Sequence, residues 1–350
     1  MAFKEILLQE KIKVENKIRE FFDQYSKQGT FYNGFLYQFY SNLTAYLLRG
    51  GKRLRPVSLI IIYKGLGGIN ENIYDLSLCV EFLHNASLVH DDIIDHDLVR
   101  RGDPSFHAFY ADWFNKNFKE FSNQADFGIT MGILGGDLLI NLGEEAILGS
   151  RFEPNKKVKA MAYYSRGYRE LINGVTTESY LQNLPLDRVS ENDYLNMTKG
   201  KTGALFEKSI LIGASLADEN ETYKKELSEF ATLLGQAFQI RDDILGVFGD
   251  PVKTGKSTEG DIREGKKTLL AIYANKNSKF TRLYGKENLT KEEIKTVKQI
   301  LKETGALDKA TKKALELAEK ASKILKGIKL NKSSYEFFNE LIRFVQSRFT

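Results

Sequence analysis

Apolar residues recur three and four positions apart along nearly the whole chain, which is the spacing of an amphipathic α-helix. Short segments rich in glycine, proline, asparagine or aspartate interrupt this spacing, as turns do. These segments are 50–51, 67–68, 102–104, 153–155 and 249–251. No run between them alternates strictly between apolar and polar residues in the manner of a hairpin strand. The pattern predicts an all-α protein with about a dozen helices.

Composition favours one globular domain. The 350 residues contain only 5 prolines, so long stretches can run as uninterrupted helix. Length alone would suggest about two domains, but no stretch rich in Pro, Ser and Gly separates two halves. Hydrophobic residues make up 42% and charged residues 28% of the chain, which is ordinary for a protein with a buried core. We therefore predict a single helical domain over residues 1–350, with its least regular segment, a mobile loop, at 249–265.

Charge and cysteine content exclude several classes of protein. The net charge of +5 is small, and basic residues alternate with acidic ones, so a nucleic-acid partner is not indicated. The basic exception, residues 309–329, has apolar residues at helical spacing and is typical of a solvated amphipathic helix. The start of the chain is charged, and Asp137 interrupts the apolar stretch 127–143, so neither a signal peptide nor a membrane span is expected. The lone Cys79 suits the cytoplasm.

The segment Leu88–Asp95 places three aspartates among apolar residues. Buried carboxylates must be paired or must bind a cation to offset the cost of desolvation. A helix turns by about 100° per residue, so Asp91 and Asp95 lie one turn apart on one face, with Asp92 beside them. All three could meet one cation. Oxygen ligands without cysteine favour Mg²⁺, which usually shares its coordination with a phosphate.

A second acidic motif follows at Phe238–Gly246, where Asp242 and Asp243 again stand among apolar residues. One such motif alone would be interpreted as a solvated helix end. Because the arrangement recurs, we expect two buried helices whose acidic ends face each other across a cavity.

Basic residues flank both acidic motifs and could bind phosphate. The run Gly50–Pro56, with sequence GGKRLRP, precedes a predicted helix, where backbone donors and the helix dipole also favour an anion. The run lacks the spacing of a nucleotide P-loop. His84 and His107 are candidates for hydrogen bonds to phosphate or for plain packing. The other basic candidates are Arg100, Arg101, Lys199, Lys201, Lys256, Lys266 and Lys267.

Together these motifs make the chain similar to the trans-isoprenyl diphosphate synthases, also called polyprenyl synthetases. The resemblance covers about Gly50 to Lys267. It includes, in order, GGKRLRP, the DDxxD motif at Asp91–Asp95, Arg100-Arg101-Gly102, Gly136-Asp137-x-Leu139, Lys201-Thr202 and Phe238-Gln239-x-x-Asp242-Asp243. The resemblance implies a bundle of antiparallel helices around a deep central cavity, usually as a homodimer. It also implies head-to-tail condensation of an allylic diphosphate with isopentenyl diphosphate, with loss of pyrophosphate.

The resemblance also assigns roles to residues, and these are expectations. Magnesium held by Asp91, Asp92, Asp95 and Asp242 would assist departure of the allylic diphosphate. Thr202 and Gln239 would stabilise the allylic cation by their oxygen dipoles. The departing pyrophosphate would take the last proton. Residues expected to bind the two diphosphates are Lys52, Arg55, His84, Arg100, Arg101, Lys201, Lys256 and Lys266.

Two departures from the family pattern qualify these roles. Many members have a third aspartate in the second motif, where this chain has Gly246. Members also commonly carry a Gly-Gln pair before the Lys-Thr motif, where this chain has Gly174-Val175 with Glu178 downstream. We expect metal binding to survive the first departure and assign no role at the second.

Product length depends, in this family, on large side chains four and five residues before the DDxxD motif. Here these positions are Ser87 and Ala86, and both are too small to block a growing chain. Farnesyl diphosphate is therefore disfavoured as the final product, and geranylgeranyl diphosphate or a longer product is expected. The next obstacles along the helix are Leu83 and Phe82, and the sequence does not say which of them points toward the product.

Two other functions remain open alternatives. A class I terpene cyclase shares the first DDxxD motif, but the residues that it needs after the second motif are replaced by Val247 and Pro251. A cyclase also has no use for a second diphosphate site. A non-catalytic partner subunit of a heteromeric synthase could discard its acidic motifs, and this chain keeps them.

Overall fold

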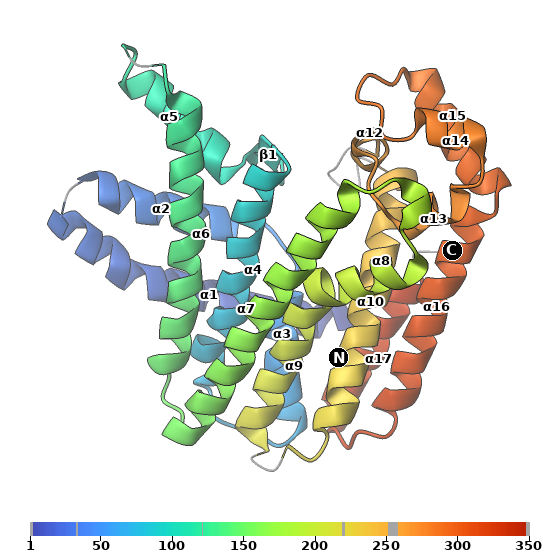
Figure 1. Cartoon of the computed structure of the whole chain (residues 1–350). Helices are drawn as coiled ribbons and strands as arrows, with labels where there is room; N and C mark the ends of the chain where they lie inside the picture. Colours follow the sequence, from blue (N-terminus) through green and yellow to red (C-terminus); the bar gives the residue numbers. More distant parts are fainter. Residues whose placement is uncertain (1–2, 33, 121, 219–220, 251–257, 348–350) are drawn as a thin grey trace. The chain divides into compact units, whose positions relative to one another are not determined.

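The computed structural model describes residues 3–32, 34–120, 122–218, 221–250 and 258–347. These residues form helices and one short two-stranded ribbon (Figure 1), so the all-α prediction is confirmed. The chain divides into two compact units. Unit 1 contains Met1–Tyr164 and Ile212–Asn220, and unit 2 contains Ser165–Leu211 and Glu221–Thr350. The single domain over 1–350 stays a prediction.

Unit 1 consists mainly of long helices from the first half of the chain. It includes part of α7 (Pro154–Gln182) and part of α9 (Ala204–Ala217). Its other elements are α1 (Phe3–Tyr32), α2 (Gly34–Leu48), α3 (Leu54–Gly65), α4 (Ile73–Ile94), β1 (Val99–Arg100), β2 (Asp103–Pro104), α5 (Phe106–Asn117) and α6 (Gln124–Leu148). The predicted breaks at 50–51 and 67–68 fall between these helices, and the break at 153–155 coincides with the start of α7 at Pro154.

Helices α4 and α6 run side by side at the centre of unit 1 (Figure 1). Glycines on α6 permit the close approach. A Cβ atom on Gly132 would lie 2.6 Å from Cδ1 of Ile93, and one on Gly136 would overlap the ring of His90. The two helices are antiparallel, because the later residue of α6 meets the earlier residue of α4. Among the described helices, α6 alone is long and apolar enough to cross a membrane, by length and composition only.

The ribbon of β1 and β2 is an addition to the predicted helices. Arg100 pairs with Asp103 across a two-residue turn. Both turn residues have positive φ, 56° at Arg101 and 85° at Gly102, as a type I′ turn requires. The strands are two residues long, too short to show an alternating pattern.

Unit 2 contains the rest of α7 and α9 and all later elements. These are η1 (Leu186–Arg188), α8 (Glu191–Thr198), the π-helical turn η2 (Lys199–Gly203), α10 (Lys224–Phe248), α12 (Gly260–Glu264), α13 (Leu269–Ala274), α14 (Ser278–Leu283), α15 (Lys291–Glu303), α16 (Ala306–Leu325) and α17 (Lys332–Gln346). The predicted loop at 249–265 therefore contains a short helix, and residues 251–257 lie outside the described part.

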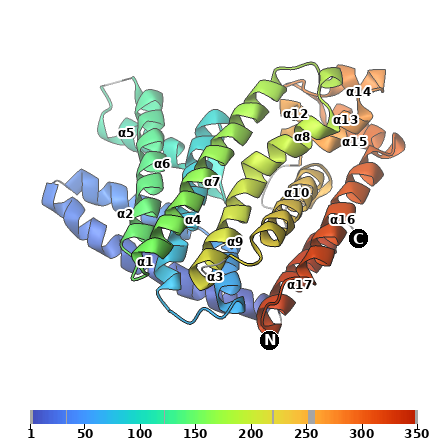
Figure 2. The ribbon, with the colours of Figure 1, turned by 60° about the horizontal axis from the view of Figure 1, so that its bottom comes forward.

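Helices α10, α16 and α17 form the main helical layer of unit 2 (Figure 2). Helix α16 covers most of the basic stretch 309–329. It buries Ala310, Ala314, Leu317, Ala318, Ala321 and Leu325 on one face. The amphipathic helix predicted there is confirmed.

Candidate active site

The first acidic motif occupies the end of α4. Asp91 is half-buried and Asp95, which caps the helix, is exposed. Asp92 instead points into unit 1 and is fully buried. Its carboxylate accepts a hydrogen bond from the Tyr46 hydroxyl at 3.2 Å and forms a two-nitrogen ion pair with Arg100. Burial raises the pKa of Asp92, and the guanidinium of Arg100 opposes that rise. Asp92 is thus held in an ion pair with Arg100, and its metal role stays a prediction.

The type I′ turn brings Arg101 to the GGKRLRP segment. Its Nη1 donates to the carbonyl oxygens of Arg49 at 2.9 Å and Gly50 at 3.5 Å. Gly51 has a φ of 95° and lies against both Arg101 and Arg53. A β-carbon there would be strained and would press on two guanidinium groups. Gly51 and the type I′ turn therefore determine the position of the Arg101 guanidinium.

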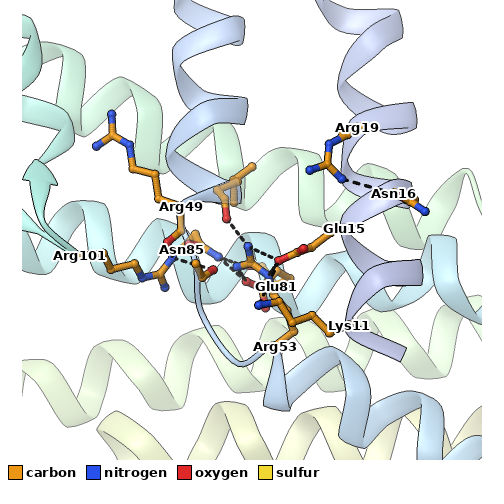
Figure 3. A network of polar contacts seen from close by, with 11 residues as sticks. Lys11, Glu15, Asn16, Arg19, Arg49, Arg53, Glu81, Asn85 and Arg101 are labelled. Atoms are coloured by element: carbon orange, nitrogen blue, oxygen red, sulfur yellow. Dashed lines mark hydrogen bonds and ion pairs between the residues drawn. The ribbon is translucent and has the colours of Figure 1, made fainter. Parts of the chain in front are cut away.

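Arg53 anchors the GGKRLRP segment to the neighbouring helices, a role that the sequence did not reveal (Figure 3). Its side chain is fully buried although its backbone is left-handed, with a φ of 53°. It donates to Glu81 on α4 at 2.6 Å, to Glu15 on α1 at 3.2 Å and to the carbonyl oxygen of Leu47 at 2.6 Å. Asn85 also donates to Glu81, at 2.8 Å. Arg53 thereby links α1, α2 and α4.

His84 lies one turn from Glu81, within a cluster of arginines. Burial lowers the pKa of His84 well below its ordinary value, and the charges of Arg55, Arg101, Arg53 and Arg100 lower it further. The imidazole is therefore neutral at physiological pH. Lys52 is exposed and Arg55 is half-buried at the first turn of α3. The structure thus brings Arg55 and Arg101 close enough for their charges to act on His84, and their role in binding a diphosphate stays a prediction. His107 is buried beside Ser105, at 3.2 Å from its hydroxyl.

The second acidic motif, in unit 2, holds a chain of hydrogen bonds. Asp242 is exposed, whereas Asp243 is half-buried on α10. Tyr194 donates to Oδ2 of Asp243 at 2.6 Å, and the amide nitrogen of Gln239 donates to Oδ1 at 2.7 Å. The Thr202 hydroxyl donates to Oε1 of Gln239 at 2.6 Å. Thr202 and Gln239, both predicted from the sequence, are therefore in direct contact.

Asp261 completes this acidic cluster and was missed from the sequence. A Cβ atom on Gly246 would lie 2.6 Å from Oδ2 of Asp261, so the glycine leaves room for that carboxylate. Burial raises the pKa of Asp243 to about 7, and the charges of Asp261 and Asp242 contribute to the rise. The sequence offered one indication of this carboxylate: Gly246 stands where many members of the resembled family have a third aspartate. An acidic residue from α12 lies beside that position.

The predicted lysines are placed near carboxylates. Lys201, in η2, forms an ion pair with Glu178 of α7. A Cβ atom on Gly174 would overlap the backbone nitrogen of Lys201, so this glycine lets α7 approach η2. Lys266 lies 3.5 Å from Asp261 and 3.1 Å from Glu264. Lys256 falls outside the described residues.

The acidic groups fit a divalent cation in part. Within the part of the chain that the structure describes, no three His, Cys, Asp or Glu side chains converge as a complete metal-binding group. The predicted meeting of Asp91, Asp92 and Asp95 is not found, because Asp92 faces Arg100. Burial, followed by the negative charges of Asp261 and Asp242, raises the pKa of Asp243, and a bound cation would offset those charges.

The residues before the first acidic motif are small or already packed. Ala86 and Leu83 are buried, and the hydroxyl of Ser87 donates to the carbonyl oxygen of His84 at 2.7 Å. Phe82 packs against Phe21 and Phe22 of α1, with ring centroids 5.1 and 5.5 Å apart. The sequence could not say which way Phe82 points, and the structure places it in this aromatic cluster.

Comparison with known proteins identifies the family. The sequence model of the Polyprenyl synthetase family matches residues 37–304. A short chain isoprenyl diphosphate synthase of Methanocaldococcus jannaschii is 37% identical over 73% of this chain and 74% of its own length. A geranylfarnesyl diphosphate synthase of Aeropyrum pernix is 35% identical over 85% of this chain and 91% of its own. The chain belongs to the polyprenyl synthetase family.

A solved structure agrees with this assignment. Geranylgeranyl pyrophosphate synthase from Corynebacterium glutamicum, complexed with isoprenyl diphosphate and magnesium, superposes with a TM-score of 0.89. It is 25% identical in sequence, and the match covers 99% of this chain and 100% of that one. By family and fold the protein is an all-trans prenyltransferase that elongates prenyl chains.

Proposed function

We propose that the protein condenses isopentenyl diphosphate with an allylic diphosphate and produces geranylgeranyl diphosphate or a longer polyprenyl diphosphate. The observation that carries this proposal is the basic cluster around His84, next to the helix with the first acidic motif. Four arginine charges act on one neutral imidazole there, and such a cluster suits a diphosphate. A terpene cyclase binds a single diphosphate and has no use for it.

Isopentenyl diphosphate would bind to Lys52, Arg55, His84 and Arg101. Arginine forks bind phosphate oxygens in pairs, and a neutral imidazole can donate one further hydrogen bond. Arg53 lies in the same segment, but its donors are engaged by Glu81 and Glu15. We therefore assign Arg53 to holding the segment and its neighbours to holding the substrate.

The allylic diphosphate would bind between cations. Asp91 and Asp95 in unit 1, and Asp242 in unit 2, would each be ligands of Mg²⁺, with Asp261, which lies beside Gly246, as a further carboxylate in unit 2. When bound, the metal neutralises the diphosphate and makes it a better leaving group. Asp92 would act by holding Arg100 toward that group. Lys201, Lys256 and Lys266 would contribute the remaining positive charge.

Departure of the diphosphate leaves an allylic cation, which the oxygens of Thr202 and Gln239 would stabilise. Fixed dipoles in a site that excludes water stabilise developing charge most strongly. The double bond of isopentenyl diphosphate then forms the new carbon–carbon bond, and the released pyrophosphate takes the proton. Each cycle adds five carbons.

Product length would be set by the α4 residues before the acidic motif. Ala86 and Ser87 are small enough to let a chain pass, so farnesyl diphosphate would not be the end product. Leu83 is the first large side chain beyond them and is our candidate for the obstacle. Phe82 packs against Phe21 and Phe22 of α1 and would support Leu83 from behind.

We also propose a cytoplasmic homodimer. Helix α6 exposes three large apolar side chains: Ile129 at 38%, Ile133 at 46% and Leu134 at 51%. Such an exposed row marks a contact surface. A second copy of this chain would cover it, and Ile133→Lys should then shift the protein to monomer in sedimentation. Cys79 is buried, as suits a compartment without disulfides.

A binding experiment tests the basic cluster. Calorimetric titration with isopentenyl diphosphate, in the absence of metal and allylic substrate, should show binding to the wild-type protein. Arg55→Ala should weaken it by roughly tenfold or more, the size of one charge-assisted hydrogen bond. Arg343→Ala is the matched control, because that arginine is an exposed surface residue. Lack of binding by the wild-type protein, or equal binding by Arg55→Ala, would contradict the assignment.

A further inference from the structure

Three hydrogen bonds in unit 2 connect a buried tyrosine to the oxygens assigned to the allylic cation. They run from Tyr194 to Asp243, from Gln239 to Asp243 and from Thr202 to Gln239, with lengths of 2.6, 2.7 and 2.6 Å. We propose that Tyr194 and Asp243 are positioning residues that fix the orientation of the Gln239 amide and the Thr202 hydroxyl. The inference rests on the proposed function, because it concerns the two side chains assigned to stabilise the cation.

The orientation of the amide follows from the chemistry of its neighbours. The NH₂ end of Gln239 donates to Oδ1 of Asp243, and its carbonyl oxygen faces away and accepts from Thr202. The reverse orientation would place two oxygens in contact. The single hydroxyl proton of Thr202 is directed to that carbonyl oxygen. The unused lone pairs of Thr202 and Gln239 are therefore what a neighbouring cation meets.

Tyr194 supplies the second donor that keeps Asp243 in place. The ring is 1% exposed, and burial together with the charge of Asp243 raises the pKa of Tyr194 well above its ordinary value. The hydroxyl therefore stays protonated and donates. Without it, one carboxylate oxygen would lose its bond, and the group could rotate away from Gln239.

The helix that carries Tyr194 is itself fixed. Helix α8 begins with a capping box, in which Ser190 and Asp193 bond to each other's backbone nitrogen. Its first residue, Glu191, forms an ion pair with Lys313 of α16 at 2.5 Å. Glu191 also accepts a hydrogen bond from the Tyr273 hydroxyl at 2.6 Å. Tyr273 provides a matched control. Its hydrogen bond to Glu191 of α8 is as short as the bond from Tyr194 to Asp243, and it has no link to Gln239.

Steady-state kinetics test the proposal. Tyr194→Phe should lower kcat by roughly tenfold, the effect of about 1.4 kcal/mol on a transition state, and should leave the KM for isopentenyl diphosphate within about twofold. Tyr273→Phe should leave kcat within about twofold. In a Gln239→Ala background, Tyr194→Phe should cause no further loss of kcat, because the amide that Tyr194 helps to orient is then absent.

Several results would overturn the proposal. Equal losses of kcat in Tyr194→Phe and Tyr273→Phe would show a general effect on α8, and independent, multiplying losses in the double variant would show that Tyr194 does not act through Gln239. A crystal structure of Tyr194→Phe gives a test that does not depend on turnover. A displaced or rotated Gln239 amide supports positioning, and an unmoved one excludes it. Inactivity of the wild-type protein would instead contradict the proposed function.

Discussion

Replacing Arg53 by methionine should destabilise unit 1 strongly. The side chains of Arg53 and Glu81 are 0% and 2% exposed, and their ion pair is 2.6 Å long. Loss of the guanidinium leaves the carboxylate of Glu81 buried with Asn85 as a remaining donor. Breaking a buried pair in this way costs about 3–5 kcal/mol. The left-handed backbone at position 53 is retained in the variant, so the change isolates the side chain.

Urea unfolding gives the measurement. Trp113 is the one tryptophan of the sequence and belongs to unit 1, so its fluorescence follows that unit. Lys116→Met is the matched control, because Lys116 and Asp112 of unit 1 are also 2.6 Å apart but are 71% and 60% exposed. Exposed pairs contribute about 0–1 kcal/mol.

A double variant separates buried charge from lost packing. Arg53→Met combined with Glu81→Leu should unfold at higher urea concentration than Arg53→Met alone, because no unpaired charge is then left in the interior. The role of Arg53 in a buried ion pair is refuted if Arg53→Met costs no more stability than Lys116→Met. It is also refuted if adding Glu81→Leu lowers stability further.

Three more predictions concern the proposed site. Asp91→Ala should lower turnover by about a hundredfold or more, because it removes a group placed at the transition state, and its circular dichroism should be unchanged. The control is Asp112→Ala, at an exposed ion pair on α5. Near-normal synthesis by Asp91→Ala would reject the metal role. Phenylalanine at Ala86 or Ser87 should shorten the product while total incorporation stays similar, as chromatography of the products would show; unchanged length in both active variants would place the obstacle elsewhere. The free energy of unfolding should fall as the pH drops below about 6.5, because His84 has a lowered pKa and only the unfolded chain takes up its proton. Fluorescence of Trp113 should show this slope flattened in His84→Gln, and an identical slope would contradict a neutral, buried His84.

The sequence predicted helix positions well, because they depend on local spacing. The turn segments at 50–51 and 67–68 separate helices, 153–155 coincides with the start of α7, and 309–329 lies mostly in an amphipathic helix with its alanines inside. Such features follow from periodicity and from the conformational demands of glycine and proline. The grouping of Arg55, His84 and Arg101 was anticipated through the family resemblance.

The direction of individual side chains could not be predicted, because it depends on partners distant in sequence. Asp92 turns inward since Arg100, placed by the type I′ turn, lies beneath it. Asp261 lies over Gly246 because α12 returns to α10, a contact that no local pattern encodes. The structural role of Arg53 was not predicted, because its donors are taken by Glu81 and Glu15 from two other helices.

Incubation with radiolabelled isopentenyl diphosphate tests the central claim most directly. The purified full-length protein would receive Mg²⁺ and, in separate reactions, allylic primers of five, ten, fifteen and twenty carbons. The account predicts that label enters acid-labile allylic diphosphates of twenty carbons or more and that chelating the metal stops the reaction. Absence of incorporation with every primer, or formation of cyclic hydrocarbons without consumption of isopentenyl diphosphate, would contradict it.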